Sequence, residues 1–121
     1  MTELLQSLPD KFPGVILATL HFSPLSPEWL SGHLSRTVRL PIRSPRSDGF
    51  DIREGEIIVA RPDHHLIVLD GRVVSSRGPS ENLWRPAIDV LFRTAAVAYT
   101  GRVIGVLMSG ELDDGVAGLQ A

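Results

Sequence analysis

Two residues able to take part in acid–base chemistry, His21 and Asp114, each follow an apolar run. Residues 15–20 and 103–108 are continuous apolar runs of the kind that form strands buried on both faces of a parallel sheet. In an open α/β sheet, ligands bind beyond the carboxyl ends of the strands. A histidine and an aspartate that meet at this edge could act as a general base and the carboxylate that orients it.

The same residues also have a purely structural interpretation. His21 can be the first exposed residue after a strand, and Asp113 or Asp114 can cap the helix expected at the end of the chain. Spacing alone favours this role, since His and Asp routinely end strands and start helices. The catalytic hypothesis predicts that His21 and Asp114 lie at one edge of the sheet, close enough for a hydrogen bond.

No residue stands out as the nucleophile. The chain has no cysteine, which excludes disulfides, thiolate metal sites and a cysteine nucleophile. It also has no G-x-S-x-G turn, the strand-to-helix elbow that presents a nucleophilic serine. Ser109 lies in the loop with the acids and Ser23 lies two residues after His21. Neither has the expected elbow, so we interpret both as hydrogen-bonding loop residues.

Metal and cofactor sites are not indicated. His64 and His65 are adjacent, and neighbours on an extended segment point to opposite faces, so they do not easily share one ion. A packed or surface role is therefore favoured for both, and His33 has no partner in the sequence. The chain also lacks a glycine-rich phosphate-binding motif. We expect no metal and no cofactor.

Composition excludes several classes of protein. A chain of 121 residues is long enough for one domain with its own core. It carries 12 Lys and Arg against 14 Asp and Glu, which argues against a nucleic-acid binder. No apolar run approaches the ~20 residues needed to cross a bilayer, and the N-terminus lacks the order of a signal peptide. We expect a cytoplasmic protein with no nucleic-acid partner and no membrane insertion.

Hydrophobic patterning predicts the elements that position these residues. Leucines at helical spacing within residues 4–8 indicate a short helix, and a longer helix is expected from about Pro86 to Tyr99. Asp70 and Gly71 give the strongest hairpin signal, within an antiparallel excursion expected around residues 57–75. The predicted fold class is three-layer α/β, with a mostly parallel, doubly wound sheet and this hairpin excursion.

In their order and spacing, several stretches of the chain resemble the catalytic domain of the chemotaxis receptor methylesterases, the CheB family. Each stretch is modest alone, but in this order and spacing they are strong together, and the resemblance extends over almost the entire chain. One of these stretches is VARPDHHL at 59–66, and the most specific are RPAIDVLF at 85–92 and IGVLMSG at 104–110, which runs on into Asp114 and Gly115.

This resemblance implies a doubly wound α/β domain that hydrolyses glutamate methyl esters on chemoreceptors and can deamidate certain glutamines. It matches His21 to the histidine and Asp114 to the aspartate of a Ser-His-Asp triad. His21 would take the serine proton and pass it to the leaving methanol, while Asp114 would hold the imidazole tautomer and stabilise its cation. Methylated chemoreceptor helices are the implied partner.

The chain departs from the family pattern in several places. The family's G-x-S-x-G-G serine turn, the strand before it, the elements expected beyond Gly118 and the receiver domain have no counterpart. Glu111 and Leu112 replace the usual Met and Gly, and Arg61 replaces a small residue or Pro. We therefore expect residues 1–121 to be a single incomplete methylesterase-like domain without esterase activity of its own. The alternative is a non-catalytic binding module that retains the fold.

The resemblance also has a consequence for assembly. The family's first strand is central, so without it the strand at residues 15–20 is left with an unpaired edge and an apolar side-chain run. We expect a homo-oligomer formed through this edge, or a marginal monomer that aggregates.

Overall fold

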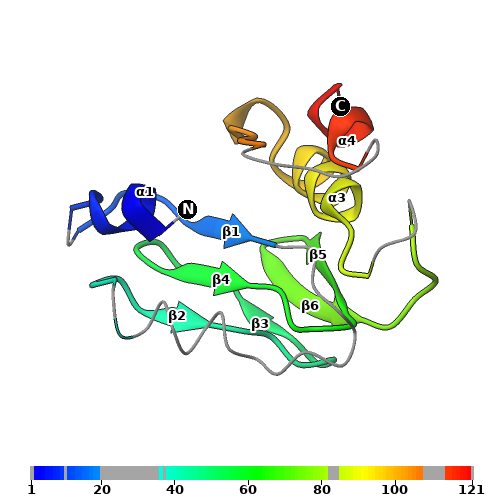
Figure 1. Cartoon of the computed structure of the whole chain (residues 1–121), viewed down its shortest axis with the longest axis horizontal. Helices are drawn as coiled ribbons and strands as arrows, with labels where there is room; N and C mark the ends of the chain where they lie inside the picture. Colours follow the sequence, from blue (N-terminus) through cyan, green and yellow to red (C-terminus); the bar gives the residue numbers. More distant parts are fainter. Residues whose placement is uncertain are drawn as a thin grey trace.

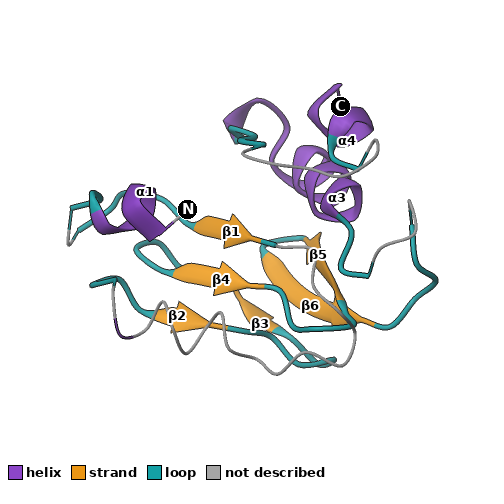
Figure 2. Cartoon of the chain, in the orientation of Figure 1, coloured by secondary structure: helices purple, strands orange, loops and turns teal. Residues whose placement is uncertain are grey.

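Short strands form two three-stranded sheets, one parallel and one antiparallel (Figures 1 and 2). The computed structural model describes residues 2–9, 11–19, 36, 38–81, 85–107 and 114–120. The parallel sheet has the order β1-β4-β2, with strands β1 (Ile16–Ala18), β4 (Ile57–Val59) and β2 (Ile42–Arg43). The antiparallel sheet has the order β3-β6-β5, with strands β3 (Phe50–Asp51), β6 (Arg72–Ser76) and β5 (His65–Leu69).

Helices cover both faces of the parallel sheet. The covering helices are α1 (Thr2–Gln6) and α3 (Ile88–Tyr99), while the 3₁₀ turn η1 (Thr100–Arg102) and α4 (Val116–Gln120) contact α3. Side chains alternate along β4, so Ile57 packs in one core with Leu5 of α1, while Ile58 packs in a second core with Leu91 of α3. The three-layer α/β class is therefore confirmed.

The hairpin between β5 and β6 forms at the predicted turn. Asp70 and Gly71 both have positive φ, 44° and 77°, as the two central residues of a type I′ turn require. The antiparallel pairing begins at His65, which lies opposite Ser76. Strand β4 pairs in parallel with β1 and β2. The antiparallel part of the excursion expected around residues 57–75 therefore starts after β4.

Residues 103–107 do not form the buried strand that their apolar sequence predicts. They have no regular structure, and Ile104 and Val106 are 91% and 58% exposed. Strand β1 forms but is less buried than predicted, since Ala18 is buried and Ile16 and Leu17 are only partly buried. The physical reason is that a strand needs neighbours to pair with and pack against, and within the described residues no strand pairs with residues 103–107.

Helix α3 ends at Tyr99 as predicted and begins two residues after Pro86. Its inner face includes the buried residues Ile88, Leu91 and Ala95, and it packs on β5. None of the helices in the described part of the chain combines the length and the apolar character of a membrane span.

Candidate active site

The carboxylate of Asp114 lies at the N-terminus of α3. Its Oδ2 accepts the backbone N–H of Ile88 at 2.6 Å, and its Oδ1 accepts that of Asp89 at 2.9 Å. The first N–H groups of a helix have no partner within the helix, and they carry a partial positive charge that favours a nearby anion. The helix's own N-cap residue, Ala87, supplies no side-chain hydrogen bond. Asp114, only 1% exposed, therefore caps α3 from a distant part of the chain.

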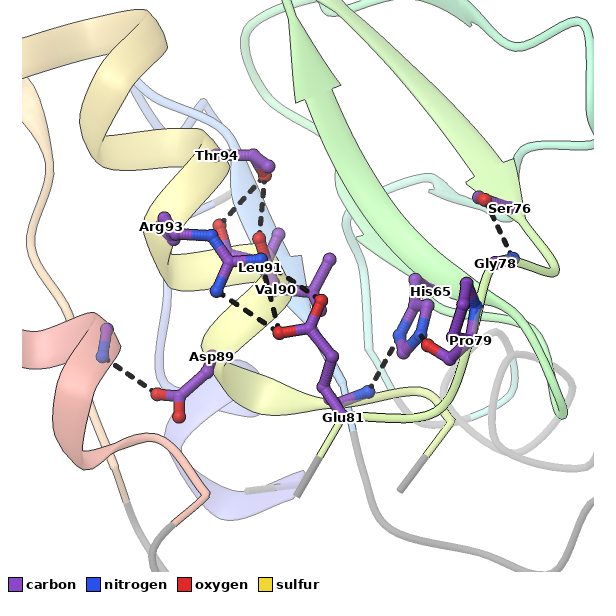
Figure 3. Close-up of polar contacts among 12 residues, drawn as sticks. His65, Ser76, Gly78, Pro79, Glu81, Asp89, Val90, Leu91, Arg93 and Thr94 are labelled. Atoms are coloured by element: carbon purple, nitrogen blue, oxygen red, sulfur yellow. Dashed lines mark hydrogen bonds and ion pairs between the residues drawn. The ribbon is translucent and has the colours of Figure 1, made fainter. Parts of the chain in front are cut away.

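A second buried carboxylate, Asp89, makes the reciprocal contact. Its Oδ1 accepts the backbone N–H of Gly115 at 2.9 Å and that of Gly118 at 2.8 Å. Figure 3 shows the Asp89 side chain reaching from α3 toward α4. Each aspartate thus accepts N–H groups from the segment that carries the other. The result is a paired link between the start of α3 and the turn that leads into α4.

Two glycines allow this turn to approach α3 closely. Gly115 has a φ of +98°, which favours glycine, and a Cβ there would lie 3.0 Å from atoms of Ile88. A Cβ at Gly118 would collide with the Cβ of Phe92 and lie 3.1 Å from Oδ1 of Asp89. A side chain at either glycine would push the Asp114 carboxylate away from the helix end.

Of the triad residues predicted from the sequence, Asp114 lies in the described part of the chain. His21 lies outside the described residues, as do Ser23, Ser109 and Asp113. The hydrogen bond expected between His21 and Asp114 therefore stays a prediction. The structural interpretation had Asp113 or Asp114 capping the last helix. The structure shows that Asp114 caps α3.

The sequence alone does not indicate that Asp89 belongs to this site. The available signal was an acid in the first turn of α3, on a helix whose neighbouring positions are apolar. Aspartate is common near helix N-termini, where it is usually solvated. Asp89 is only 5% exposed because the turn at Gly115 packs against it.

A second polar link joins the start of α3 to the antiparallel sheet. His65 of β5 is 3% exposed, its Nδ1 accepts the N–H of Ala87 at 3.2 Å, and its Nε2 lies 2.8 Å from the carbonyl oxygen of Pro79. A carbonyl oxygen can only accept, so these partners place the proton on Nε2. Figure 3 shows His65 between Pro79 and the start of α3. His65 therefore has a packed role, one of the two roles expected for the histidine pair.

Ion pairs connect Asp63, in the turn before β5, to two arginines beside this link. Asp63 has a positive φ of 60°, and its carboxylate accepts Nε of Arg85 at 2.8 Å and a terminal N–H of Arg77 at 2.8 Å. The hydrogen bond from Arg85 lowers the pKa of Asp63, and the charges of both arginines lower it further. Among the described residues, no group of three His, Cys, Asp or Glu side chains is arranged to hold a metal ion.

Known proteins resemble the chain over its whole length. Residues 1–121 match the family model of the CheB methylesterase domain. A protein-glutamate methylesterase/protein-glutamine glutaminase of Burkholderia thailandensis is 35% identical over the full chain, and one of Pseudomonas syringae pv. syringae is 34% identical over 98% of it. The chain spans about 35% of the length of each of these relatives.

The fold is similar as well. The crystal structure of the Thermotoga maritima CheB methylesterase catalytic domain superimposes with a TM-score of 0.79 at 27% sequence identity. The match covers 94% of this chain and 62% of that one.

Proposed function

Because the chain belongs to the CheB methylesterase family, we propose that it serves the hydrolysis of glutamate methyl esters on chemoreceptors. It supplies His21 and Asp114 to a Ser-His-Asp triad. The observation that supports this proposal is the buried Asp114 carboxylate, which is oriented by two N–H groups of α3. By its relatives' printed names, glutaminase activity is a second reaction of the same site.

The contacts of Asp114 suit the role of an orienting carboxylate. A triad aspartate holds the imidazole in one tautomer and stabilises the cation that forms when the histidine takes the serine proton. The positive end of α3 favours the charged form of such a carboxylate. A carboxylate has about four acceptor positions, so capping α3 and orienting an imidazole are compatible tasks for Asp114.

In the proposed reaction, the serine oxygen attacks the ester carbonyl while His21 takes its proton. His21 then passes that proton to the leaving methanol, and an acyl-enzyme remains. Water, activated in turn by His21, releases the free glutamate side chain and restores the serine. The 121 residues contain no G-x-S-x-G turn, so the proposal assigns the serine to a segment outside them.

The test is a fusion that joins a G-x-S-x-G-G segment from a methylesterase relative to the start of this chain. We expect the fusion to release methanol from methylated receptors and the 121-residue chain alone to release none above background. His21→Ala or Asp114→Asn in the fusion should lower the rate by roughly 10³-fold or more. Asp113→Asn is the matched control and should leave the rate within a few-fold.

A folded fusion that releases no methanol would contradict the proposal. A cooperative thermal transition establishes that the fusion is folded. If this inactive fusion still binds methylated receptor segments, the alternative of a non-catalytic binding module replaces the enzyme.

A further inference from the structure

The side chain of Asp89 makes contacts that the capping of α3 does not require. Asp114 already accepts the N–H groups of Ile88 and Asp89 at the helix end. The carboxylate of Asp89 accepts the N–H groups of Gly115, at 2.9 Å, and Gly118, at 2.8 Å, and it reaches toward α4 in Figure 3. Asp89 is only 5% exposed. Since a buried charge costs free energy that its hydrogen bonds must offset, a second buried acid here calls for a role beyond the cap.

The cap itself is built in an unusual way. Most helices are capped by a Ser, Thr, Asp or Asn at the N-cap position, within the same segment. In α3 that position is Ala87, which supplies no capping side chain, and the acceptor comes from Asp114, 26 residues along the chain from Ile88. Proteins depart from such local rules mainly at functional sites. We therefore interpret the arrangement as one that places the Asp114 carboxylate.

Asp89 acts on Asp114 through the backbone. The N–H of Gly115 belongs to the planar peptide group that also contains the carbonyl of Asp114. Its bond to Asp89 therefore fixes one side of the Asp114 backbone, and the bond at Gly118 anchors the start of α4. The helix end is held as well, because Nδ1 of His65 accepts an N–H group at the start of α3 at 3.2 Å. Both segments that Asp114 joins are thus fixed in place.

Gly118 offers a way to move the turn without changing any charge. A Cβ at this position would collide with the Cβ of Phe92 and lie 3.1 Å from Oδ1 of Asp89. A single methyl group there would therefore displace the turn from α3. The effect of this displacement separates the position of the turn from the charge of Asp89.

We propose that Asp89 is a positioning residue for the reaction, because it holds the turn at residues 114–118 so that the Asp114 carboxylate keeps the direction from which it orients His21. Asp89 has no contact with the ester in this proposal and acts only through Asp114. The inference rests on the proposed function, since the triad is what requires a fixed carboxylate. Small displacements matter there, because a misplacement of about 1 Å can lower a rate by about 10²-fold.

NMR of the 121-residue chain tests the positioning without any catalysis. The amide proton of Ile88 is bonded to the Asp114 carboxylate at 2.6 Å, a short charge-assisted bond that moves its signal downfield. Asp114→Ala, or the unfolded chain in urea, gives the signal of the broken bond. In Asp89→Ala and Gly118→Ala we expect the Ile88 signal to move toward that value. A cooperative thermal transition establishes that a variant is folded, and the two substitutions are independent routes to the same displacement.

Asp89→Asn separates position from charge in the same experiment. The side-chain oxygen of Asn can accept both N–H groups of the turn, although the charge is lost. We expect the Ile88 signal of Asp89→Asn to stay near that of the parent chain. Glu56→Ala is the matched control, since Glu56 is also a buried acid and its carboxylate is bonded to Arg43 and Arg53, which lie outside α3 and the turn. It should leave the Ile88 signal unchanged.

The kinetic test uses the fusion with the serine-bearing segment. Asp89→Ala and Gly118→Ala should lower kcat roughly tenfold or more and keep KM within about threefold, because a misplaced carboxylate weakens stabilisation of the transition state and not the binding of the ester. Asp89→Asn and Glu56→Ala should each keep kcat within about threefold. A merely structural role would give Asp89→Ala and Glu56→Ala similar losses of kcat.

Three results overturn the inference. They are an Ile88 signal that stays at the parent position in Asp89→Ala and Gly118→Ala, an Asp89→Asn variant that behaves like Asp89→Ala, and an unchanged kcat for Asp89→Ala in an active fusion. A parent fusion that is itself inactive counts against the proposed function instead. The Ile88 signal then decides by itself whether Asp89 holds the Asp114 carboxylate in place.

Discussion

Two segments that follow α3 differ in burial, and the difference is the opposite of what their sequences suggest. Residues 114–118, a turn and the first residues of α4, include one Asp and two Gly, yet they are joined to α3 by four hydrogen bonds of 2.6 to 2.9 Å and include buried residues. Residues 103–107 are apolar, yet they are largely exposed. Burial here follows the availability of a partner. The N-terminus of α3 offers N–H groups to the carboxylate of Asp114, while no described strand offers its edge to residues 103–107.

We expect the largest effect on the free energy of unfolding for Asp114→Ala. It leaves the N–H groups of Ile88 and Asp89 buried without their acceptor and removes the negative charge at the helix end. We expect the free energy of unfolding to fall by about 3 kcal/mol in urea denaturation. Glu54→Ala, at an exposed acid, is the control and should cost less than about 0.5 kcal/mol. Equal losses for the two variants would mean that the capping contacts contribute little.

A smaller loss is expected for Asp89→Ala, by about 2 kcal/mol, because two N–H groups of the turn lose their acceptor. Asp89→Asn keeps an oxygen acceptor and should recover part of this loss. Hydrogen exchange gives the sharper measurement. The amides of Gly115 and Gly118 should lose protection before those of β5 and β6. Uniform loss of protection across the chain would show that the Asp89 contacts stabilise the whole fold and not only the link between α3 and α4.

Acid should weaken the Asp63 cluster. The arginines lower the pKa of Asp63 in the folded state, Arg85 most strongly. The stabilisation is therefore present above the unfolded-state pKa of about 3.9 and disappears as the pH falls through the lower folded-state pKa. We expect Asp63→Asn to be less stable than the parent chain at neutral pH and the difference to shrink in strong acid. A difference that grows on acidification would contradict this assignment.

The smallest effect is expected for Ile104→Ser. At a concentration where the chain is monomeric, the free energy of unfolding should change by less than about 0.5 kcal/mol, because the side chain is 91% exposed. The same type of substitution in the core, Ile58→Ser, should cost several kcal/mol, since it removes packing and buries a hydroxyl. A large loss at Ile104 in the monomer would show that residues 103–107 are packed after all.

Local signals in the sequence determined several features of this protein. Asp70 and Gly71 specify the hairpin because a type I′ turn requires positive φ at both positions. The apolar spacing of residues 88–99 specifies α3 and its inner face. The motif order indicated the family, and the resemblance singled out Asp114 before any contact was known.

Only the tertiary structure decided which partners these segments have. It placed β4 in the parallel sheet between β1 and β2, and it brought Asp114 to the N-terminus of α3, a helix distant from it in sequence. It also left residues 103–107 exposed despite their apolar sequence. An apolar pattern indicates that a segment gains free energy from burial, but the edge or face that buries it lies far away in the sequence, and only the folded chain shows whether that edge is present.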